Sequence, residues 1–444
     1  MRTELRKTLF LLLCLSLLLC LAPAALAAGG NVVTIPAGVT LIESEAFADC
    51  QNMTAVRIPA GVKRIGPMAF AGCDALKEVF FEGSESDWLA VNIDDGNGPL
   101  VDTIITCAGG QRLVPVNKRY FPDEYFRGLV ASSVDTNHDG LLNDAERAAV
   151  ERFGCSGTRE EYSPVTSIQG IEFFPNLTHL YCQFGQISSL DVSALLNLEV
   201  FYCPNNLLTS LDVTHNPKLK ILSCVYNQIT TLDVSKNPLL ELLCVSGNGM
   251  DSLDLSANVN LKNLYCHYNN LRTLDLSNCK AMEGVFCAYN EMMSSIKVSG
   301  CPELVALDLS GNDLTSLDVS RNKKLQELWM WRNDLTGKLD LSQNAALVRV
   351  NLSANHNLTS VSLPAAQNLE LLRVQNTGIT GINIRNCPII RQAFLQGTYY
   401  DFTGVYDSGS FWGGYKLGDG INPDSTREVD HCQFTVNKDV QITA

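Results

Sequence analysis

Apolar residues recur at short, regular intervals through the second half of the chain. Between about Phe174 and Cys387, a stretch of the form L-x-x-L-x-C is followed by a turn residue and then by a second short apolar stretch. The unit occurs ten times, at steps of 21 or 22 residues. A period of this length indicates a repeat array in which each unit packs against its neighbours. The turn residues are Gly185, Asn206, Asn227, Asn248, Asn269, Asn290, Asn312, Asn333, Asn355 and Thr377.

In each unit the residues five and three positions before the turn residue are apolar, as Leu222 and Cys224 are before Asn227. Apolar residues two positions apart predict a short strand with one buried face. Strands that recur at this period stack in parallel, and the spacing is the leucine-rich-repeat signature. We therefore expect a leucine-rich-repeat solenoid, a parallel β-strand ladder, over residues 174–390.

Many of the sixteen Cys residues fall on one inward position of this ladder. In other repeats the same position holds Val245, Leu309 or Met330, so it is a packing position, where free Cys acts as a small hydrophobe. Stacked parallel strands do not offer the dihedral angle that a disulfide needs. We favour a buried thiol ladder over a disulfide or metal stack. The residues are Cys182, Cys203, Cys224, Cys266 and Cys287.

A different repeat comes earlier, in residues 29–115. TIPAGVTLIESEAFADC is followed by RIPAGVKRIGPMAFAGC, with Pro36 and Pro59, and Cys50 and Cys73, each 23 residues apart. These units resemble the BspA-like leucine-rich repeats of bacterial surface proteins. Two units are too few to be stable alone, so we expect them to rest on closing strands near residues 103–114 or on the segment that follows.

Residues 116–173 change to a helical period and contain the loop DTNHDGLLNDAE. Short oxygen-bearing side chains alternate in it, with Gly140 at the sixth position, where an EF-hand loop turns sharply. Hard Ca²⁺ needs six to eight oxygen ligands, which this spacing supplies. The predicted ligands are Asp135, Asn137, Asp139, the carbonyl of Leu141, Asn143 and the bidentate carboxylate of Glu146.

The alternative for this loop is a fortuitous acidic turn between two helices. EF-hands usually work in pairs, and the sequence contains one such loop. We therefore expect structural calcium that locks a helical, EF-hand-like N-cap onto the array. Beyond Cys387 the period stops, and Gly and Asp turns separate short alternating stretches. Since an open solenoid end exposes apolar core and strand edges, we expect a β-rich C-cap over residues 391–444.

Two outward columns of the array could have a function. The second half of most repeats carries an outward Asp, either solvated with its Ser, Thr and Lys neighbours or forming a stripe for cations. These residues are Asp191, Asp212, Asp233, Asp254, Asp275, Asp318 and Asp340.

The first half of each repeat carries outward aromatic residues that the core does not need. They could stack on one another along the ladder, or they could bind a partner, since Tyr and Trp give large contact area at low entropic cost. We favour binding. The predicted contact residues are Tyr265, His267, Tyr268, Phe286, Tyr289, Trp329 and Trp331.

The first 28 residues have the form of a cleaved signal peptide: basic Arg2, Arg6 and Lys7, an apolar run, and a small-residue end at Ala25-Leu26-Ala27. No later stretch is apolar enough to span a bilayer. The chain is acidic, with a formal net charge of -14, which disfavours nucleic acid as a partner. We expect a secreted or cell-surface protein. No LPxTG-type motif occurs before Ala444, so its means of retention stays open.

Residues 117–390 resemble the internalins, listerial surface proteins with a helical cap related to EF-hands. The 21-residue repeat L-x-x-L-x-C-x-x-N-x-L-T-x-L-D-V-S-x-N is similar to that of the internalin J type, which carries the same Cys. The resemblance implies an adhesin-like protein whose partner is a protein or glycan of a host or neighbouring cell surface. The alternative is a non-binding, calcium-stabilised structural spacer of the cell envelope. No H-E-x-x-H, G-x-S-x-G or P-loop motif occurs, so we do not expect an enzyme.

Overall fold

A computed structural model of the protein describes residues 31–383, 387, 392–394 and 441–443. The chain divides into an N-terminal unit, Met1–Ala149, and an array unit, Val150–Ala444. The expected signal peptide, residues 1–28, and most of the expected C-cap lie outside the described residues. Within the described part of the chain, no helix is long and apolar enough to cross a membrane.

The N-terminal unit is built on a six-stranded sheet in the order β1-β3-β5-β7-β8-β9. Val33, Val56 and Val79 are register partners, so the 23-residue sequence period is also the period of the parallel strands β1, β3 and β5. A small sheet, β2-β4-β6, forms the second side of these turns. The bounds are β1 Asn31–Thr34, β2 Leu41–Ile42, β3 Met53–Ile58, β4 Arg64–Ile65, β5 Glu78–Phe81, β6 Asn92–Ile93, β7 Ile104–Thr106, β8 Arg112–Pro115 and β9 Leu141–Leu142.

One core fills this unit, and the repeated residues of the sequence lie in it. Phe70, Cys73 and Val79 are fully buried, and the rings of Phe47 and Phe70 stack with centroids 5.2 Å apart. The short helices α2 (Glu85–Leu89) and α3 (Gly98–Val101), followed by the turn η2 (Ala108–Gly110), lead to the closing strands. The strands expected near residues 103–114 are therefore present as β7 and β8.

The helix pair around the predicted calcium loop belongs to the N-terminal unit. Helix α4 (Glu124–Ser133) is capped by Asp123, whose side chain accepts a hydrogen bond from the Phe126 amide. Helix α5 (Asp144–Ala148) is capped by Asn143, which forms a capping box with Glu146. Strand β9 lies inside the loop and pairs antiparallel with β8.

The unit boundary therefore falls after Ala149, within the segment 116–173 that the sequence suggested as a cap of the array. The physical reason is the pairing of β9 with β8, which ties the loop to the first repeat region. The array unit starts with β10 (Arg152–Gly154), which pairs with β11. The turn η3 (Ile171–Phe173) lies between these two strands in the sequence. A strand thus precedes the ten repeats that the sequence period revealed.

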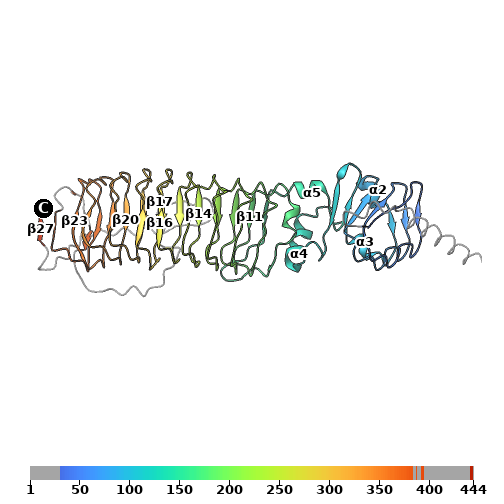
Figure 1. Ribbon diagram of the computed structural model, residues 1–444, viewed down its shortest axis with the longest axis horizontal. Coiled ribbons are helices and arrows are strands. Elements are labelled where there is room, and N and C mark those ends of the chain that lie inside the picture. The colour runs from blue at the N-terminus through green and yellow to red at the C-terminus, as the bar shows by residue number, and fades with distance from the viewer. Residues whose placement is uncertain (1–30, 384–386, 388–391, 395–440, 444) are drawn as a thin grey trace, which may run out of the picture. The chain divides into compact units, whose positions relative to one another are not determined.

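The array unit is a parallel β-solenoid, which confirms the leucine-rich-repeat ladder (Figure 1). Its main sheet has twelve strands in the order β10-β11-β12-β13-β14-β15-β17-β19-β20-β22-β24-β26, and the middle residue of each strand from β10 to β24 points into the core. The further bounds are β11 His179–Tyr181, β12 Val200–Tyr202, β13 Ile221–Ser223, β14 Leu242–Cys244, β15 Asn263–Tyr265, β17 Gly284–Phe286, β19 Ala306–Asp308, β20 Glu327–Trp329, β22 Arg349–Asn351, β24 Leu371–Arg373 and β26 Gln392–Phe394.

Short two-stranded sheets form the second side of the array: β16 with β18, β21 with β23, and β25 with β27. Their bounds are β16 Thr273–Asp275, β18 Ser295–Lys297, β21 Gly337–Asp340, β23 Leu358–Ser362, β25 Gly381–Asn383 and β27 Gln441–Thr443. Strands β26 and β27 are the described parts of the expected C-cap. The rest of that prediction, residues 395–440, lies outside the described residues.

The predicted thiol ladder points inward. Cys182, Cys203, Cys224, Cys266 and Cys287 are at most 1% exposed, and all are free thiols. Burial in the apolar core raises the pKa of Cys224 to about 12, so its thiol stays protonated at neutral pH. The position therefore contributes packing, as its exchange with Val and Leu in other repeats indicated.

A ladder of Asn side chains closes the turn of each repeat. Asn227 Nδ2 donates to the carbonyls of Cys203 and Cys224, both at 3.0 Å, and its Oδ1 accepts from the Leu208 amide at 3.0 Å. Two of these three groups belong to the preceding repeat, so each Asn joins two repeats. Asn206, Asn248, Asn269, Asn290, Asn312, Asn333 and Asn355 make equivalent bonds to carbonyls.

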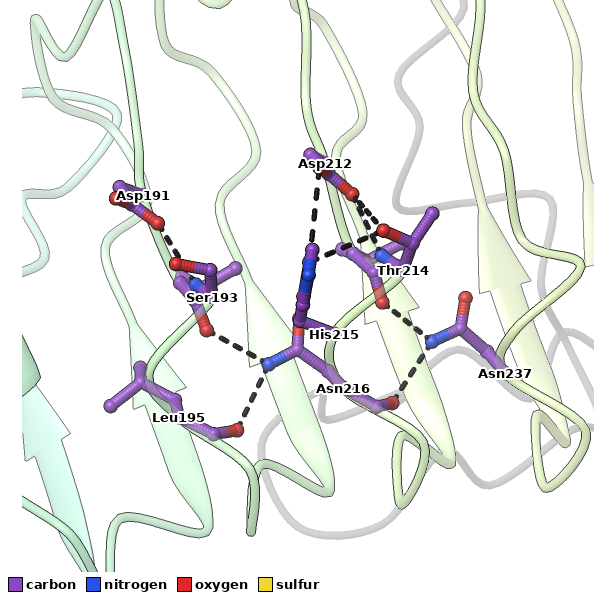
Figure 2. A network of polar contacts seen from close by, with 10 residues as sticks. Asp191, Ser193, Leu195, Asp212, Thr214, His215, Asn216 and Asn237 are labelled. Carbon is purple, nitrogen blue, oxygen red and sulfur yellow. Dashed lines mark hydrogen bonds and ion pairs between the residues drawn. The ribbon is translucent and has the colours of Figure 1, made fainter.

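A second Asn column lies beside the outward Asp column (Figure 2). Asn216 Nδ2 donates to the carbonyls of Val192 and Leu195, both at 2.9 Å. In the same repeat, the side chain and amide of Thr214 donate to Asp212 Oδ1, which holds the pKa of that carboxyl below its ordinary value. The Asp residues therefore form the local turn, which favours the structural interpretation of the column over a cation stripe.

Substituting Asn227 by Ala tests the Asn ladder. The change removes three buried hydrogen bonds and leaves two carbonyls and one amide without this partner, so we expect a loss of about 3 kcal/mol in the free energy of unfolding. Guanidinium unfolding followed by circular dichroism measures it. Asn260→Ala is the control, because Asn260 is exposed and donates to the Pro238 carbonyl alone. Equal losses in the two variants would contradict the role of the ladder.

Candidate binding surface and candidate calcium loop

The outer face of the main sheet carries the predicted contact residues in three columns. The centre column is the last residue of each strand: Tyr181, Tyr202, Ser223, Cys244, Tyr265, Phe286, Asp308, Trp329, Asn351 and Arg373. The flanking column, two residues further on, includes His267 and Trp331. The turn column, three residues after the centre column, is Phe184, Asn205, Tyr226, Gly247, Tyr268, Tyr289, Gly311, Arg332, Ala354 and Asn376.

Two aromatic residues of the centre column are largely covered by their neighbours. The rings of Tyr265 and Phe286 stack with centroids 4.9 Å apart and an interplanar angle of 13°. They form an apolar cluster with Leu242 and Ala306, and each ring residue is 9% exposed. Stacking on each other therefore explains the position of these two rings, and they offer a partner little free area.

The turn column presents its aromatic rings differently. All ten of its residues have positive φ, from 52° at Phe184 to 66° at Gly311, a conformation that most side chains avoid. This backbone turns the side chains to the edge of the strand face. Tyr226 and Tyr268 are 50% and 43% exposed there.

Three predicted contact residues meet at this edge. The rings of Tyr268 and Tyr289 stack at 4.8 Å with an interplanar angle of 4°. The Trp331 ring stands edge-on to Tyr289, with centroids 5.9 Å apart. Aromatic pairs in stacked or edge-to-face geometry hold one another in place, so these rings form a contiguous and ordered group.

Two glycines of the turn column make room for the neighbouring rings. A Cβ at Gly247 would lie 2.3 Å from Cδ1 of Tyr226, and one at Gly311 would lie 2.9 Å from Cδ1 of Tyr289. Each Tyr ring thus lies over the glycine of the next repeat. The sequence analysis did not identify these glycines, although they occupy the positions that hold Tyr in other repeats.

His267 is held as a neutral acceptor on this face. Its Nδ1 accepts a hydrogen bond from the Ala288 amide at 3.2 Å, and its ring lies 6.3 Å from that of Phe286. Burial lowers its pKa to about 4. The imidazole is therefore uncharged at neutral pH, and Nδ1 is committed to the array backbone.

Trp329 lies on the outer face of β20 and leans toward Glu327. Its Nε1 donates to Glu327 Oε2 at 3.4 Å, and Glu327 Oε1 pairs with Arg349 at 2.6 Å. Like Trp331, it is partly exposed. The structure thus separates the seven predicted contacts into a buried pair (Tyr265 and Phe286), an edge group (Tyr268, Tyr289 and Trp331), and the half-buried His267 and Trp329.

The predicted calcium loop has the backbone of a closed turn. His138 and Gly140 have φ of 58° and 79°. Asp139 Oδ1 accepts from the Leu141 amide at 2.8 Å, and Asn137 Oδ1 accepts from the Asp139 amide at 3.0 Å. Alternate side chains are thus folded back over the loop, as its spacing suggested.

The carboxylates at the two ends of the loop differ in their partners. Asp135 Oδ2 accepts from the Gly140 amide at 3.0 Å, while Asp135 Oδ1 is buried with no hydrogen-bond partner. Glu146 Oε1 accepts from the amide and hydroxyl of Thr136, both at 2.9 Å, and Oε2 accepts from the Asn143 amide at 3.1 Å. A buried carboxylate oxygen without a donor is costly, and a cation would compensate it.

The donors of this loop suit calcium more than a transition metal. Among the described residues, no group of three or more His, Cys, Asp and Glu side chains is placed to hold a metal. The three carboxylates of the loop, from Asp135, Asp139 and Glu146, are therefore not gathered around one point in this structure. Together with the Asn side chains and the Leu141 carbonyl, they are oxygen donors of the kind that hard cations accept. The orphan Asp135 Oδ1 and this all-oxygen set fit Ca²⁺.

Two family profiles match parts of the chain. One, described as BspA type leucine rich repeat region, matches residues 30–88, and the other, described as Zer-1-like, leucine-rich repeats, matches residues 220–346. The first agrees with the resemblance found for the early repeat. No curated protein matches the chain in sequence.

Several solved structures are similar to this chain. The functional domain of InlJ from Listeria monocytogenes, which includes a cysteine ladder, is 27% identical, with 64% of this chain and 71% of that chain covered and a TM-score of 0.47. The internalin InlF from Listeria monocytogenes str. 4b F2365 is 20% identical, with 64% and 84% covered and a TM-score of 0.52. The plant peptide hormone receptor RGFR1 in complex with RGF2 is 13% identical, with 80% and 58% covered and a TM-score of 0.45. The likeness to InlF shows a shared leucine-rich-repeat fold.

The lowered pKa of His267 predicts a pH-dependent loss of stability. The unfolded chain binds a proton near the ordinary pKa of about 6.5, whereas the folded chain does so only near 4. Proton binding therefore favours the unfolded chain as the pH falls from 6.5 to 4. His267 alone should lower the free energy of unfolding by about 2 kcal/mol over this range. Unfolding of the native chain and of His267→Gln, compared between pH 7 and 4.5, measures the difference.

The control for this titration is His215→Gln, since the His215 side chain is 61% exposed. We expect the native chain and the His215 variant to weaken in parallel as the pH falls. The His267 variant should weaken less over the same range. Identical pH profiles for all three proteins would contradict the assignment.

Proposed function

We propose that the protein is a secreted or cell-surface binding protein, whose array recognises a protein or glycan through its outer aromatic face. The observation that carries this proposal is the edge group, in which Tyr268, Tyr289 and Trp331 are ordered by one another and yet remain accessible. Rings that served the array alone would gain most from burial, as Tyr265 and Phe286 do.

The rigidity of the array supports a binding role. Each turn is fixed by backbone bonds and by an Asn of the ladder, so the rings need little further ordering when a partner arrives. Aromatic residues provide most of the binding energy at many protein interfaces. The leucine-rich-repeat fold shared with InlF agrees with a scaffold for surface recognition, and we propose no catalytic role.

We further propose that the loop from Asp135 to Glu146 holds a structural Ca²⁺. Asp135, Asp139 and Glu146 would supply charge, with Asn137, Asn143 and the Leu141 carbonyl completing the oxygen set. The ion would compensate the buried Asp135 Oδ1, which has no hydrogen-bond partner. Because β9 lies in the loop and pairs with β8, its effect on stability should be centred on the N-terminal unit.

The double substitution Trp329→Ala, Trp331→Ala tests the binding surface. We expect it to lower the affinity for a partner captured by the native chain by about tenfold or more, because buried aromatic anchors contribute 2 kcal/mol or more at interfaces. Biolayer interferometry with the purified partner measures the affinity. Tyr125→Ala is the matched control, since Tyr125 is an exposed ring of α4 in the N-terminal unit.

Circular dichroism must first establish that the double variant is folded. Unchanged affinity in a folded double variant would exclude the aromatic face as the binding surface. Survival of binding in Tyr125→Ala and its loss in the double variant would support the proposal. If the face is only a stack, as in a structural spacer, the double substitution should lower stability and leave every interaction of the chain unchanged.

The calcium proposal predicts a metal-dependent melting temperature. At a free Ca²⁺ concentration a hundredfold above its dissociation constant, binding adds about 2.7 kcal/mol to the stability of the folded loop. Thermal melts with Ca²⁺ and with chelator should therefore differ by about 10 °C for the N-terminal unit. Asp135→Asn should remove the difference, while Asp74→Asn, which removes one exposed charge from the same unit, should keep it.

Hydrogen exchange gives the calcium test a local readout. Ca²⁺ should slow exchange in β7 and β8, which connect to the loop through β9, and should leave β14 of the array unchanged. Identical melting curves with and without Ca²⁺ for the native chain would refute the site. Equal protection of β8 and β14 would refute its assignment to the N-terminal unit.

A further inference from the structure

A carboxylate interrupts the rings of the centre column. In the register of the main sheet, Phe286 pairs with Asp308 and Asp308 pairs with Trp329. Neighbouring strands lie about 4.8 Å apart, so the carboxylate sits between the two aromatic side chains on one face. This Asp was not among the contact residues predicted from the sequence.

Small residues near this carboxylate leave room for the neighbouring rings. A Cβ at Gly284 would lie 2.8 Å from Cε2 of Phe286, so that ring folds back over the glycine of its own strand. On the other side, the Trp329 indole donates to Glu327 of its own strand and is partly exposed. Ala306, the strand residue nearest to Asp308 on this face, adds only a methyl group. The carboxylate therefore stands in register beside a partly exposed indole.

The hydrogen bonds of Asp308 use one of its two oxygens. Oδ1 accepts from the amide of Ser310 at 3.0 Å and from its hydroxyl at 2.7 Å, and no described residue donates to Oδ2. Ser310 thus fixes the orientation of the carboxylate and leaves one oxygen for another donor. Burial beside the rings raises the pKa of this carboxyl above its ordinary value.

No cation of the described residues pairs with Asp308. Arg349, two strands away, is bound to Glu327, and Lys262 is bound to Glu241. Ion pairs of this kind recur along the face, for instance between Lys220 and Glu199. Asp308 is thus a half-buried negative charge without a cation partner among the described residues, and an external cation would complement it.

We propose that Asp308 and Trp329 receive the guanidinium group of an arginine side chain of a protein partner. The group is planar and stacks on aromatic faces, and its donors reach a carboxylate oxygen. An ammonium group has the charge but not the flat surface that stacks on the indole. A neutral sugar can stack on the indole, but it leaves the charge uncompensated. The inference rests on the proposed binding role of this face and names the chemistry of its partner.

The test uses the full chain labelled with 5-fluorotryptophan and a short probe peptide, acetyl-Gly-Arg-Gly-amide. Its control is the same peptide with citrulline, which has nearly the shape of arginine without the charge. We expect the arginine peptide to shift the fluorine resonance of Trp329 in a saturable manner. The citrulline peptide should bind at least about tenfold more weakly, since a charged hydrogen bond is lost.

Two variants with matched chemistry locate the interaction. Asp308→Asn keeps the shape and an acceptor oxygen, and should weaken binding of the arginine peptide by about tenfold or more. Asp313→Asn removes an exposed charge five residues away and should leave binding unchanged. If Asp308→Asn fails to fold, Trp329→Leu serves as the second variant and should also weaken binding, measured by isothermal titration calorimetry because it lacks the reporter indole. An arginine peptide that does not bind, or that binds Asp308→Asn and the native chain equally, would overturn the inference.

A captured partner separates this inference from the proposed function. A partner lost by the Trp329, Trp331 double variant and retained by folded Asp308→Asn would support the aromatic face and refute the arginine site. Retention by both variants would refute both. Loss in both, together with weaker binding at high salt, would support the arginine site, since glycan recognition through hydrogen bonds and stacking would survive the isosteric Asn.

Discussion

The array depends on satisfying the backbone at the turn of every repeat. A solenoid stacks its turns at strand spacing, so carbonyls and amides at each corner are buried between two repeats, where an unpaired group costs about 1–3 kcal/mol. The Asn ladder supplies the missing partners: Asn227 bonds two groups of the preceding repeat and one of its own. Hydrophobic packing alone would tolerate several side chains at this corner. The hydrogen-bond requirement selects an amide, which is both donor and acceptor.

The same requirement shapes the surface that could bind a partner. Closing the corner places the residue before each turn Asn in the left-handed region, whatever its side chain, as at Tyr226 and Tyr268. Rings in this column are therefore set at the edge of the strand face, where a glycine in the next repeat gives space to Tyr226 and Tyr289. The rings of the centre column lie on the pleated strand itself and become covered, as Tyr265 and Phe286 are. One constraint thus produces an exposed and a covered aromatic column from similar residues.

The sequence predicted the features that the repeat period determines. It did not predict features that depend on one neighbouring side chain or one short strand pairing. The two inward apolar positions recur in all ten repeats and the turn Asn in eight of them, so their roles could be inferred from the pattern. The burial of Phe286 could not, because it depends on Tyr265 before it and Gly284 beneath it. The unit boundary after Ala149 was also unforeseen, since β9 has only two residues and its pairing with β8 leaves no periodic signal. The calcium ligands, the signal peptide and the partner remain predictions.

The outward Asp column and Asp308 differ in how the fold compensates their negative charge. The outward Asp column sits among Ser and Thr donors in water, and some of its members, such as Asp275 with Lys297, also have a cation. Its charges are solvated and need no partner. Asp308 has similar hydrogen bonds from Ser310, but it lies between rings, and its pKa moves in the opposite direction from that of Asp275. Carboxylates with the same local turn thus differ in pKa because their surroundings differ. Asp308, the less solvated of the two, gains more from a bound cation.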